Sequence, residues 1–436
     1  MQLLLFDKMP EESGLNIIER MMRPRNLSEA YRRVKSNGGA PGIDGITVEQ
    51  LGGQLRLVLP RLTEQLLNGT YHPQPVRTVE IPKPGGGTRK LGIPPALDRL
   101  LQQALLQVLD PLFDPEFSKS SFGFRRGMGC HHAVRQAQLH IQQGFRWVVD
   151  LDLEKFFDRV NHDILMDRVA RKVKDKQALR LIRRYLEAGI LEGGLVSPTM
   201  EGVPQGGPLS PLLSNILLND LDQELEKRGH RFCRYADDCN VYVKSSSAGQ
   251  RVMDSLTQFL SRKLRLTVNS RKSAVDRPWK RQFLGFSFLS GRDAKLKMAP
   301  DREKRMKAKT RLLLRAGRGR KVETSLRLLA PKIRGWAGYY HLSEVKAAFE
   351  RFDEWLRRRI RAIYWRQWKR PKTRAKKLMS LGIDRDRAFK SAYNGRGPWW
   401  NSGASHMNQA FPTKRLRQLG FVSILEESQR LKRPAG

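Results

Sequence analysis

Two adjacent carboxylates stand inside a stretch with the composition of a β-strand, RYADDCNVYV (residues 234–243). Asp237 and Asp238 repel one another, and Asp is depleted from strands, so the pair carries a cost that something must offset. Taken alone, an Asp-Asp pair most often marks a hairpin turn. Here Tyr235 precedes the pair and Val241 follows it, so the flanking sequence remains strand-like. Bound cations would offset the repulsion.

A second acidic motif lies upstream, in VVDLDLEKFFDRVNHD (148–163). Asp150 and Asp152 alternate on one side of a predicted strand, and Asp152 lies at its end, where a helix is expected. Hard cations such as Mg²⁺ prefer carboxylate oxygens and keep several waters. Carboxylates from two neighbouring strands can hold two metal ions about 4 Å apart, which activates an attacking 3′-hydroxyl and stabilises a leaving pyrophosphate.

The elements that must position these acids alternate irregularly along the chain. Residues 76–94 have a hairpin pattern, with alternating residues on both sides of three glycines. The order favours an α+β body, a basic helical domain from about residue 300 and a small C-terminal module. Periodicity predicts helices at 27–35, 56–68, 96–117, 130–144, 162–189, 208–228 and 249–266. It also predicts a strand that enters a helix at 145–157, two short strands joined at the acids at 231–245, and a strand at 281–289.

The charge distribution points to a polyanionic partner. The chain has 82 Lys and Arg against 43 Asp and Glu, a formal net charge of +39. Residues 291–436 hold 39 of the basic and 12 of the acidic residues, so a third of the chain carries about two thirds of the excess. Basic fields of this size usually face phosphates. A generically basic protein and a membrane-surface role are the weaker alternatives, since the basic stretches have no apolar face of anchoring length.

Several protein classes are disfavoured. The sequence contains no run of about 18 apolar residues, so a membrane span is not expected. The N-terminal stretch MQLLLFDKMPEESG does not read as a signal peptide. The three cysteines include no CxxC pair, which argues against a zinc ribbon or a disulfide framework and fits a reducing cytoplasm.

Taken in order, several motifs resemble the reverse transcriptases of bacterial group II introns. YADD with the upstream DLDLEKFFD looks like a reverse transcriptase palm, and EGVPQGGPLSPLLSNILLNDLD (201–222) is similar to the family's Gln-Gly loop and helix. LTVNSRKSAV and FLGF follow in the family's order. The resemblance covers nearly the whole chain and is closest to the compact class without an endonuclease domain, as the lack of cysteine after position 239 also suggests. It implies a right-hand polymerase, with fingers and palm followed by an α-helical thumb or maturase domain.

This resemblance implies a metal site. Asp152 matches the first metal-binding acid and Asp237 the second. Asp238 matches a third acid that supports the site, and the carbonyl of Leu153 would be a further ligand. The implied cofactor is a pair of Mg²⁺ ions, with Mn²⁺ as a substitute.

The resemblance also implies a nucleotide site. Lys83 and Arg89 flank the glycine turn, where two cations could neutralise a triphosphate, although a basic hairpin alone is more often a solvated turn. Phe156 matches the bulky residue under the sugar, where a ring would exclude a ribose 2′-hydroxyl. Its alternative role is that of a core aromatic beside Phe157. The other matched residues are Gln205, against nucleotide and template, and Lys272, near the active site.

Two regions are expected to contact the template. Residues 37–45, NGGAPGIDG, look like the N-terminal extension that packs against template RNA in the family, and Arg32 and Arg33 precede them. In SSFGFRRGMGCHHAVRQ (120–136), Arg125 and Arg126 are expected to touch the template backbone.

Two smaller features complete this part of the chain. Gly206 would let backbone approach the bases closely. Metal binding by Cys130, His131 and His132 is disfavoured, because three adjacent residues on one helical turn point in different directions and no second ligand cluster exists.

The basic C-terminal third interleaves aromatic and cationic residues, which can stack on bases and bind phosphates. Residues 331–374 are similar to the family's thumb or maturase domain, which binds intron RNA and the primer–template duplex, and residues 380–436 to its DNA-binding region. An ordinary helical bundle with a charged back is the alternative. The residues expected to bind nucleic acid are Arg334, Trp336, Tyr339 and Arg358.

We therefore read the chain as an RNA-directed DNA polymerase that doubles as a maturase, acting in the bacterial cytoplasm at the nucleoid. The expected domains are an N-terminal extension (1–50), fingers and palm (51–295), thumb or maturase domain (296–378) and DNA-binding region (379–436). The expected partners are intron RNA, an RNA template with a DNA or RNA primer, target DNA and deoxynucleoside triphosphates, and no membrane. The alternatives are a domesticated relative in repair or defence, and a splicing factor with a decayed polymerase, which retention of all three acids disfavours.

Overall fold

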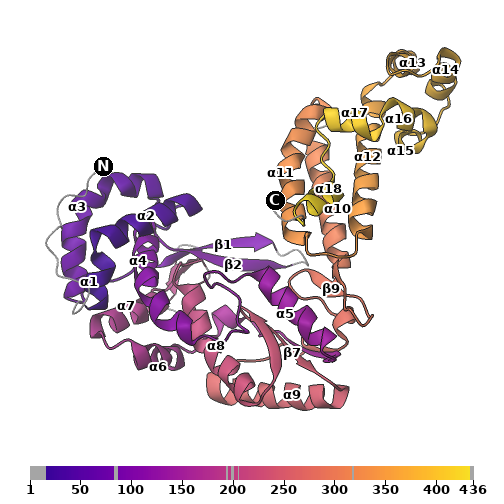
Figure 1. Ribbon diagram of the computed structural model, residues 1–436. Helices are drawn as coiled ribbons and strands as arrows, with labels where there is room; N and C mark the ends of the chain where they lie inside the picture. The colour runs from indigo at the N-terminus through magenta and orange to yellow at the C-terminus, as the bar shows by residue number, and fades with distance from the viewer. Residues whose placement is uncertain are drawn as a thin grey trace. The chain divides into compact units, whose positions relative to one another are not determined.

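The computed structural model describes residues 16–82, 87–192, 195–197, 201–204, 206–316 and 319–432 (Figure 1). The chain divides after Arg277 into two compact units, residues 1–277 and 278–436, and each is described by itself. Among the helices of the described ranges, none has the length and apolar character needed to cross a membrane.

A four-stranded antiparallel sheet forms the centre of the first unit, in the order β6-β7-β3-β8. Val148, Val149 and Val241 are buried in it, as expected for β-branched residues on a sheet covered by helices. The predicted strands on both sides of the acids are confirmed. Their bounds are β3 (Trp147–Leu151), β6 (Arg231–Tyr235), β7 (Asp238–Val243) and β8 (Ala274–Asp276).

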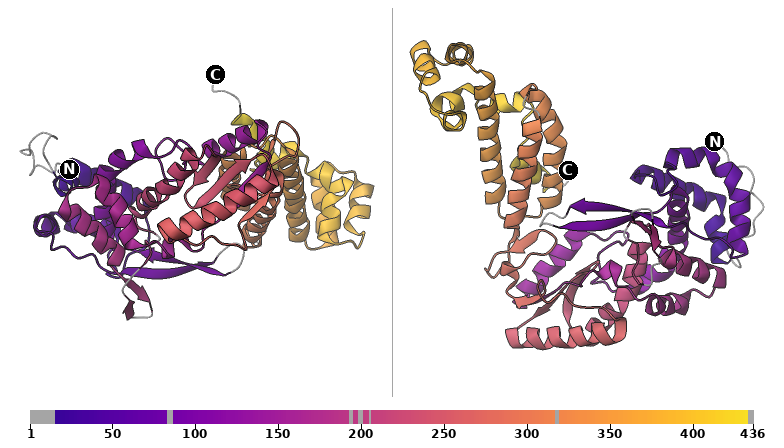
Figure 2. Two further views of the ribbon diagram at one scale, coloured as in Figure 1. Left: turned by 90° about the horizontal axis from the view of Figure 1, so that it is seen from below. Right: turned by 180° about the vertical axis from the view of Figure 1, so that it is seen from behind.

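Helices cover this sheet. Helix α9 (Ser246–Phe259), continued by the π-helical turn η3 (Leu260–Leu264), runs along one face and contacts β3, β7 and β8 (Figure 2). Gly249 permits this close approach, because a Cβ there would lie 2.4 Å from the Val275 side chain. Helices α5 (Cys130–Gln142) and α8 (Ser210–Lys227) pack beside β6, and α8 is buried around most of its circumference.

A second sheet in this unit has the order β2-β1-β4-β5. Its β1 (Val76–Pro82) and β2 (Thr88–Ile93) form the predicted antiparallel hairpin. The short strands β4 (Ile190–Glu192) and β5 (Leu195–Ser197) were not predicted.

Helices α1, α2, α3 and η1 pack against α4 (Ala96–Phe113), most of whose apolar residues are buried. Helix α3 starts at Val48, eight residues before the predicted start, because Thr47 and Gln50 form a capping box there. The bounds of the other helices are α1 (Ile17–Met22), α2 (Pro24–Asn37), η1 (Asp114–Glu116), η2 (Phe156–Asp158), α6 (His162–Lys172) and α7 (Lys176–Glu187).

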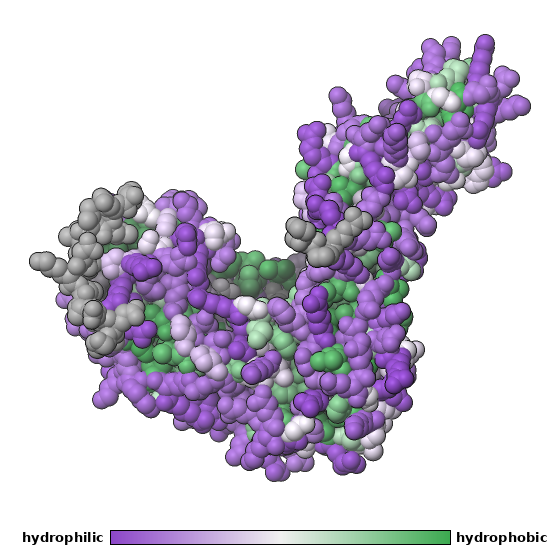
Figure 3. Space-filling view, in the orientation of Figure 1, coloured by the Kyte–Doolittle hydropathy of each residue, from purple (hydrophilic) through white to green (hydrophobic). Residues whose placement is uncertain are grey.

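The second unit is mainly helical, and hydrophilic residues dominate its visible face (Figure 3). Helices α10 (Pro300–Ala316), α11 (Val322–Tyr340), α12 (Ala347–Gln367) and α18 (Ile424–Arg430) form a bundle. Asp353 of α12 accepts hydrogen bonds from the Ser423 hydroxyl and the amides of Ile424 and Leu425, which ties α18 to the bundle. The other elements are η4 (Pro278–Lys280), β9 (Phe286–Phe288), β10 (Leu296–Met298), α13 (Pro371–Ser380), α14 (Arg385–Ala392), α15 (Pro398–Gly403), α16 (Ser405–Ala410) and α17 (Thr413–Gln418).

Candidate active site

The acids of the two motifs meet at one end of the central sheet. Strands β6 and β7 form a hairpin in which Tyr235 pairs with Asp238, so Asp237 occupies the turn. Strand β3 runs antiparallel to β7 and ends where Leu151 pairs with Cys239. Asp152, the next residue along the chain, therefore emerges beside Asp238. The β6–β7 turn itself places the acids at this end of the sheet, so the hairpin forms part of the acidic site.

These carboxylates repel one another electrostatically. The pKa of Asp238 is raised to about 7 by desolvation and by repulsion from Asp237, Asp150 and Asp152, while Lys272 acts to lower it. Asp238 lies at the solvent-exposed tip of the hairpin. A cation placed among the acids would remove that repulsion, which is the property expected of a metal site.

Asp152 is held from both its backbone and its side chain. Its amide donates to the Ser273 hydroxyl at 2.9 Å, and its carbonyl accepts from the amide of Asn269 at 2.8 Å. The Lys272 ammonium lies 3.1 and 3.3 Å from the two Asp152 carboxylate oxygens. The structure thus places the Lys272 side chain against Asp152. Its side chain is 67% exposed, so it can move when a metal ion competes for Asp152.

The donor set fits divalent cations, although the side chains as they stand do not yet close around one. In the described ranges, no three His, Cys, Asp or Glu side chains are gathered tightly enough to form a metal-binding group. Lys272 supplies the positive charge at Asp152 in this arrangement. The backbone bonds between residues 152–154 and 267–269 use the carbonyls of Asp152 and Thr267, so they leave the Leu153 carbonyl out.

A large cavity adjoins the acids. It has a volume of about 1280 Å³, and Asp237 and Asp238 form part of its wall. The loop from Asn37 to Ala40 forms another part, anchored by the buried Arg99, which donates to the carbonyls of Gly38 and Ala40 at 3.3 and 3.1 Å. The family-like N-terminal segment therefore lines the same space as the acids. Further lining residues are Leu91, Gly92, Phe124, Phe157, Gly206, Gly207 and Tyr235.

Gly206 brings its loop against the hairpin formed by β1 and β2. Its φ is +131°, and a Cβ there would lie 2.3 Å from the carbonyl oxygen of Gly92 in β2. Only glycine fits both the backbone angle and the close approach. Gly206 also lines the cavity, and its close contact is with the Gly92 backbone.

The aromatic residue of the site differs from the predicted one. Phe156 is 2% exposed and belongs to the hydrophobic core, whereas its neighbour Phe157 lines the cavity. The two rings meet edge to face, with centroids 5.2 Å apart. Lys155 has a φ of +47°, so the predicted helix does not start there and only the short η2 follows. With this backbone, the Phe156 ring enters the core and the Phe157 ring lines the cavity. Phe156 has the core role that was its alternative.

Arg125 is also placed against its predicted role. Its side chain is 8% exposed, and its guanidinium donates to the Asp114 side chain and to the carbonyls of Asp114, Ser118 and Ser121. With these donors engaged inside the protein, the side chain serves the fold and not a template phosphate. Arg126 is 63% exposed, with Asp110 at 3.3 Å, and remains accessible.

The other predicted residues of the first unit are partly described. Arg32 and Arg33 both pair with Glu29 on the surface of α2. Lys83, Gln205 and the side chain of Arg89 lie outside the described residues.

In the second unit, the predicted nucleic-acid residues have different surroundings. Arg334 is exposed and lies 3.5 Å from Glu427, while Trp336 is half-buried, edge-on to Phe352. The Tyr339 hydroxyl donates to the Leu284 carbonyl at 2.8 Å, and its ring stacks on Phe286, so it mainly supports the fold. The Arg358 guanidinium lies 4.3 Å above the ring of Trp399.

Two features of the site were not identified from sequence. Arg99 lies in α4, whose sequence predicts an ordinary amphipathic helix. No neighbouring residue marks Arg99 as the anchor of a loop about 60 residues upstream. Arg234 precedes YADD and is fully buried with Asp222. An arginine inside an otherwise apolar strand is a signal that could have found it, since such a residue requires a partner.

An antiparallel sheet that presents clustered acids beside a cavity of this size defines a nucleic-acid polymerase palm. Two family models agree: Reverse transcriptase (RNA-dependent DNA polymerase) matches residues 81–288, and Group II intron, maturase-specific domain, matches residues 303–382. The chain belongs to the reverse transcriptases and maturases of group II introns, which are RNA-directed DNA polymerases that use divalent metal ions and assist splicing.

Two curated relatives support this membership. Protein YkfC of Escherichia coli (strain K12) is 35% identical over 302 residues, covering 59% of this chain and 79% of that protein. Group II intron-encoded protein LtrA of Lactococcus lactis subsp. cremoris is 37% identical over 204 residues, covering 47% of this chain and 34% of LtrA. A solved structure, the partial Cas6-RT-Cas1--Cas2 complex, matches with 25% identity and a TM-score of 0.37, covering 57% of this chain and 43% of its own.

Proposed function

We propose that Asp152, Asp237 and Asp238 hold two Mg²⁺ ions, with the Leu153 carbonyl as a further ligand, and that the protein extends a primer on an RNA template with deoxynucleotides. The observation that carries this proposal is the convergence of the acids at one end of the central sheet, where Asp152 follows the end of β3 and emerges beside Asp238 of the β6–β7 hairpin. When bound, the metal ions would supply Lewis-acid activation of the 3′-hydroxyl and charge stabilisation of the leaving pyrophosphate.

The residues of this chain would divide the remaining work. Lys272 would leave Asp152 and remain near the incoming phosphates as a mobile cation, which its exposure allows. Gly206 would let the template base approach the backbone, and Phe157 takes the place of Phe156 as the ring beside the sugar. Lys83, Arg89 and Gln205 are proposed to bind the nucleotide.

We also propose the partners and their places. The loop 37–40, with Arg32, Arg33 and Arg126, would face the template, and Arg334, Trp336 and Arg358 would face intron RNA, primer–template duplex or target DNA. The expected division into parts 1–50, 51–295, 296–378 and 379–436 stands as part of this proposal. The charge of residues 291–436 supports a phosphate-bearing partner.

Primer extension on an RNA template tests the function. The parent protein should synthesise cDNA with Mg²⁺ and none with a chelator. Asp237→Ala should lower the rate by at least about 1,000-fold, roughly 4 kcal/mol in barrier, because a ligand shared by the reacting centre is lost. Asp254→Ala, in an exposed position on α9, is the matched control and should keep full activity. RNA binding should survive in both variants, and an active Asp237→Ala protein would remove the proposed site.

A further inference from the structure

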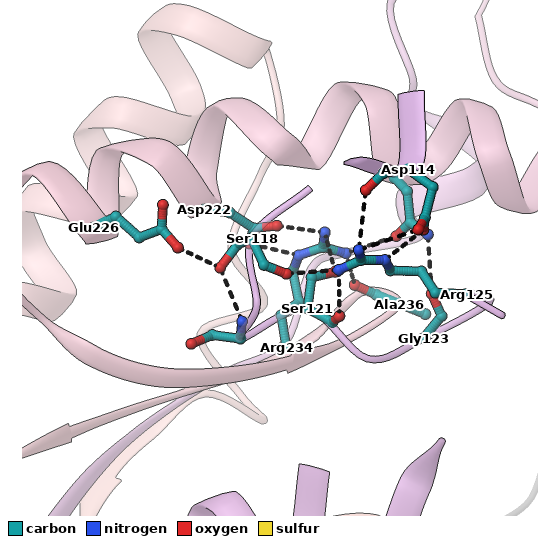
Figure 4. A network of polar contacts seen from close by, with 11 residues as sticks. Asp114, Ser118, Ser121, Gly123, Arg125, Asp222, Glu226, Arg234 and Ala236 are labelled. Atoms are coloured by element: carbon teal, nitrogen blue, oxygen red, sulfur yellow. Dashed lines mark hydrogen bonds and ion pairs between the residues drawn. The ribbon is translucent and has the colours of Figure 1, made fainter. Parts of the chain in front are cut away.

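A fully buried arginine, Arg234, lies in a network of polar contacts that includes Ala236, the residue before Asp237 (Figure 4). Arg234 and Asp222 both have 0% exposed side chains. The arginine donates from Nε and Nη2 to the two Asp222 oxygens at 2.7 and 2.6 Å, which is the bidentate geometry that a guanidinium fork allows. A buried ion pair is seldom kept for stability alone, because desolvation consumes most of the Coulombic gain.

The remaining donors of Arg234 reach the turn and its support. Nη1 donates to the Ala236 carbonyl at 2.9 Å and to Oδ1 of Asn215 at 3.0 Å, and Nη2 donates to the Ser121 hydroxyl at 2.8 Å. All five N–H groups of this side chain are thereby used. Lysine could not reproduce the pattern, because it has three donors on a single nitrogen.

Ala236 is the residue that needs such support. Its φ is +58°, in the left-handed region that residues with a Cβ rarely adopt. It directly precedes Asp237, so its conformation sets the direction in which the Asp237 carboxylate leaves the turn. A strained conformation of this kind persists only where the surroundings hold it.

The segment 118–125 closes the turn from the other side. The Phe122 amide donates to the Arg234 carbonyl, and the Arg234 amide donates to the Ser120 carbonyl, both at 2.9 Å. Gly123 packs against the turn so tightly that a Cβ would lie 2.4 Å from the Ala236 amide nitrogen. Arg125 in turn fixes the carbonyls of Ser118 and Ser121. The block that was expected to face the template therefore buttresses the hairpin.

Helix α8 completes the arrangement. It provides Asp222 and Asn215, and the Asn215 amide also donates to the Gly123 carbonyl at 2.9 Å. Burial acts to lower the pKa of Arg234, and the Asp222 carboxylate raises it.

We propose that Arg234, held by Asp222 and Asn215, is a positioning residue for the metal site: it fixes the Ala236 turn and thereby aims the Asp237 carboxylate at the metal ions. The proposal rests on the proposed function, since it assigns a role within the same site. Arg234 touches neither substrate nor metal, and its effect is transmitted through one backbone carbonyl.

Arg234→Lys is the primary test, because it keeps the charge beside Asp222 and loses the fork. We expect the kcat of primer extension to fall by about 10- to 100-fold, as for a misplacement of about 1 Å at a reacting centre. The Mg²⁺ concentration for half-maximal rate should rise at least severalfold, while primer–template affinity stays within about twofold. Arg168→Lys is the matched control, since Arg168 pairs with Asp220 on the same helix, away from the turn.

Gly123→Ala keeps the test decisive if Arg234→Lys does not fold. It removes no buried charge and pushes the Ala236 amide directly, so the same loss of kcat and the same Mg²⁺ shift are expected. Gly129→Ala is its control, because an added Cβ there meets open space and the φ of −170° suits any residue.

The outcomes distinguish a failure of the positioning role of Arg234 from a failure of the proposed polymerase activity. A folded Arg234→Lys or Gly123→Ala protein with the parent's kcat and Mg²⁺ dependence overturns the positioning role. A lower melting temperature with unchanged kinetics overturns it as well, because it shows a purely structural residue. An inactive parent counts against the polymerase instead, and titration with Mn²⁺ alone still tests Arg234, since weaker Mn²⁺ binding in the variants than in the parent is expected and equal binding refutes it.

Discussion

At the scale of single residues, the site is governed by charges that oppose one another until a cation arrives. The pKa of Asp238 is raised from its ordinary value to about 7 by desolvation and three neighbouring acids. The folded protein therefore holds a proton that the unfolded chain releases at lower pH. Without metal, the stability that this group allows is present at low pH and is lost as pH rises from about 4 to about 7.

This sign gives a prediction for Asp238→Asn. With a chelator present at pH 8, the variant should melt roughly 1–3 °C above the parent, because the amide feels no repulsion. The difference should shrink steadily as the pH falls from 7 toward 4, because the parent carboxyl is then protonated in the folded state and increasingly protonated in the unfolded chain. Adding Mg²⁺ at pH 8 should raise the melting temperature of the parent more than that of the variant. Thermal unfolding across pH 4–8 measures this, and a parent more stable than the variant in chelator would contradict it.

The two adjacent phenylalanines give a second residue-scale prediction. Phe157→Val should raise the incorporation of ribonucleotides relative to deoxynucleotides by about tenfold or more, because the ring that lines the cavity no longer excludes a 2′-hydroxyl. Phe156→Leu should lower stability by about 1 kcal/mol and leave that ratio unchanged, because this ring lies in the core. Single-nucleotide incorporation with matched triphosphates measures the ratio of ribonucleotide to deoxynucleotide for both variants. The reverse pattern would identify Phe156, the residue first expected, as the ring that excludes the 2′-hydroxyl.

At the scale of elements, we expect the backbone geometry of the loop at Gly206 to affect catalysis. Gly206→Ala adds a Cβ 2.3 Å from the Gly92 carbonyl of β2 at a φ of +131°. The loop must then move away from the hairpin, and we expect kcat/KM for nucleotide to fall by about 100-fold. Gly229→Ala has a φ of +71° in open space, so it carries the local strain without the clash and should cost about 1 kcal/mol of stability and little activity. Equal activity of both variants would show that the contact between Gly206 and β2 does not matter.

The elements that sequence predicted well are those with strong local signals. The strands around the acids, the hairpin at 76–94 and helix α8 follow from alternation, turn glycines and apolar period. The start of α3 was wrong because a capping box outweighed a weak apolar pattern at residues 48–55. The burial of Phe156 and Arg125 was difficult to predict for a different reason. Adjacent residues are distinguished only by the backbone angles and tertiary partners around them, such as the positive φ at Lys155 and the carbonyls that surround Arg125.

At the scale of the whole molecule, the excess of positive charge makes one prediction that needs no detailed pose. If binding uses six to ten phosphate contacts to single-stranded RNA, the slope of log affinity against log salt should be about −4 to −7. The double variant Arg334→Gln and Arg358→Gln should make that slope less steep by about 1 to 2, because each lost contact removes one released counterion. Arg183→Gln is the control, since this arginine of α7 is paired with Asp163 and Glu187. Fluorescence anisotropy with one RNA across 50–300 mM salt measures all three proteins. A flat profile for the parent would separate the basic surface from RNA binding, whereas an unchanged slope in the double variant would move the contacts to other cations of residues 291–436.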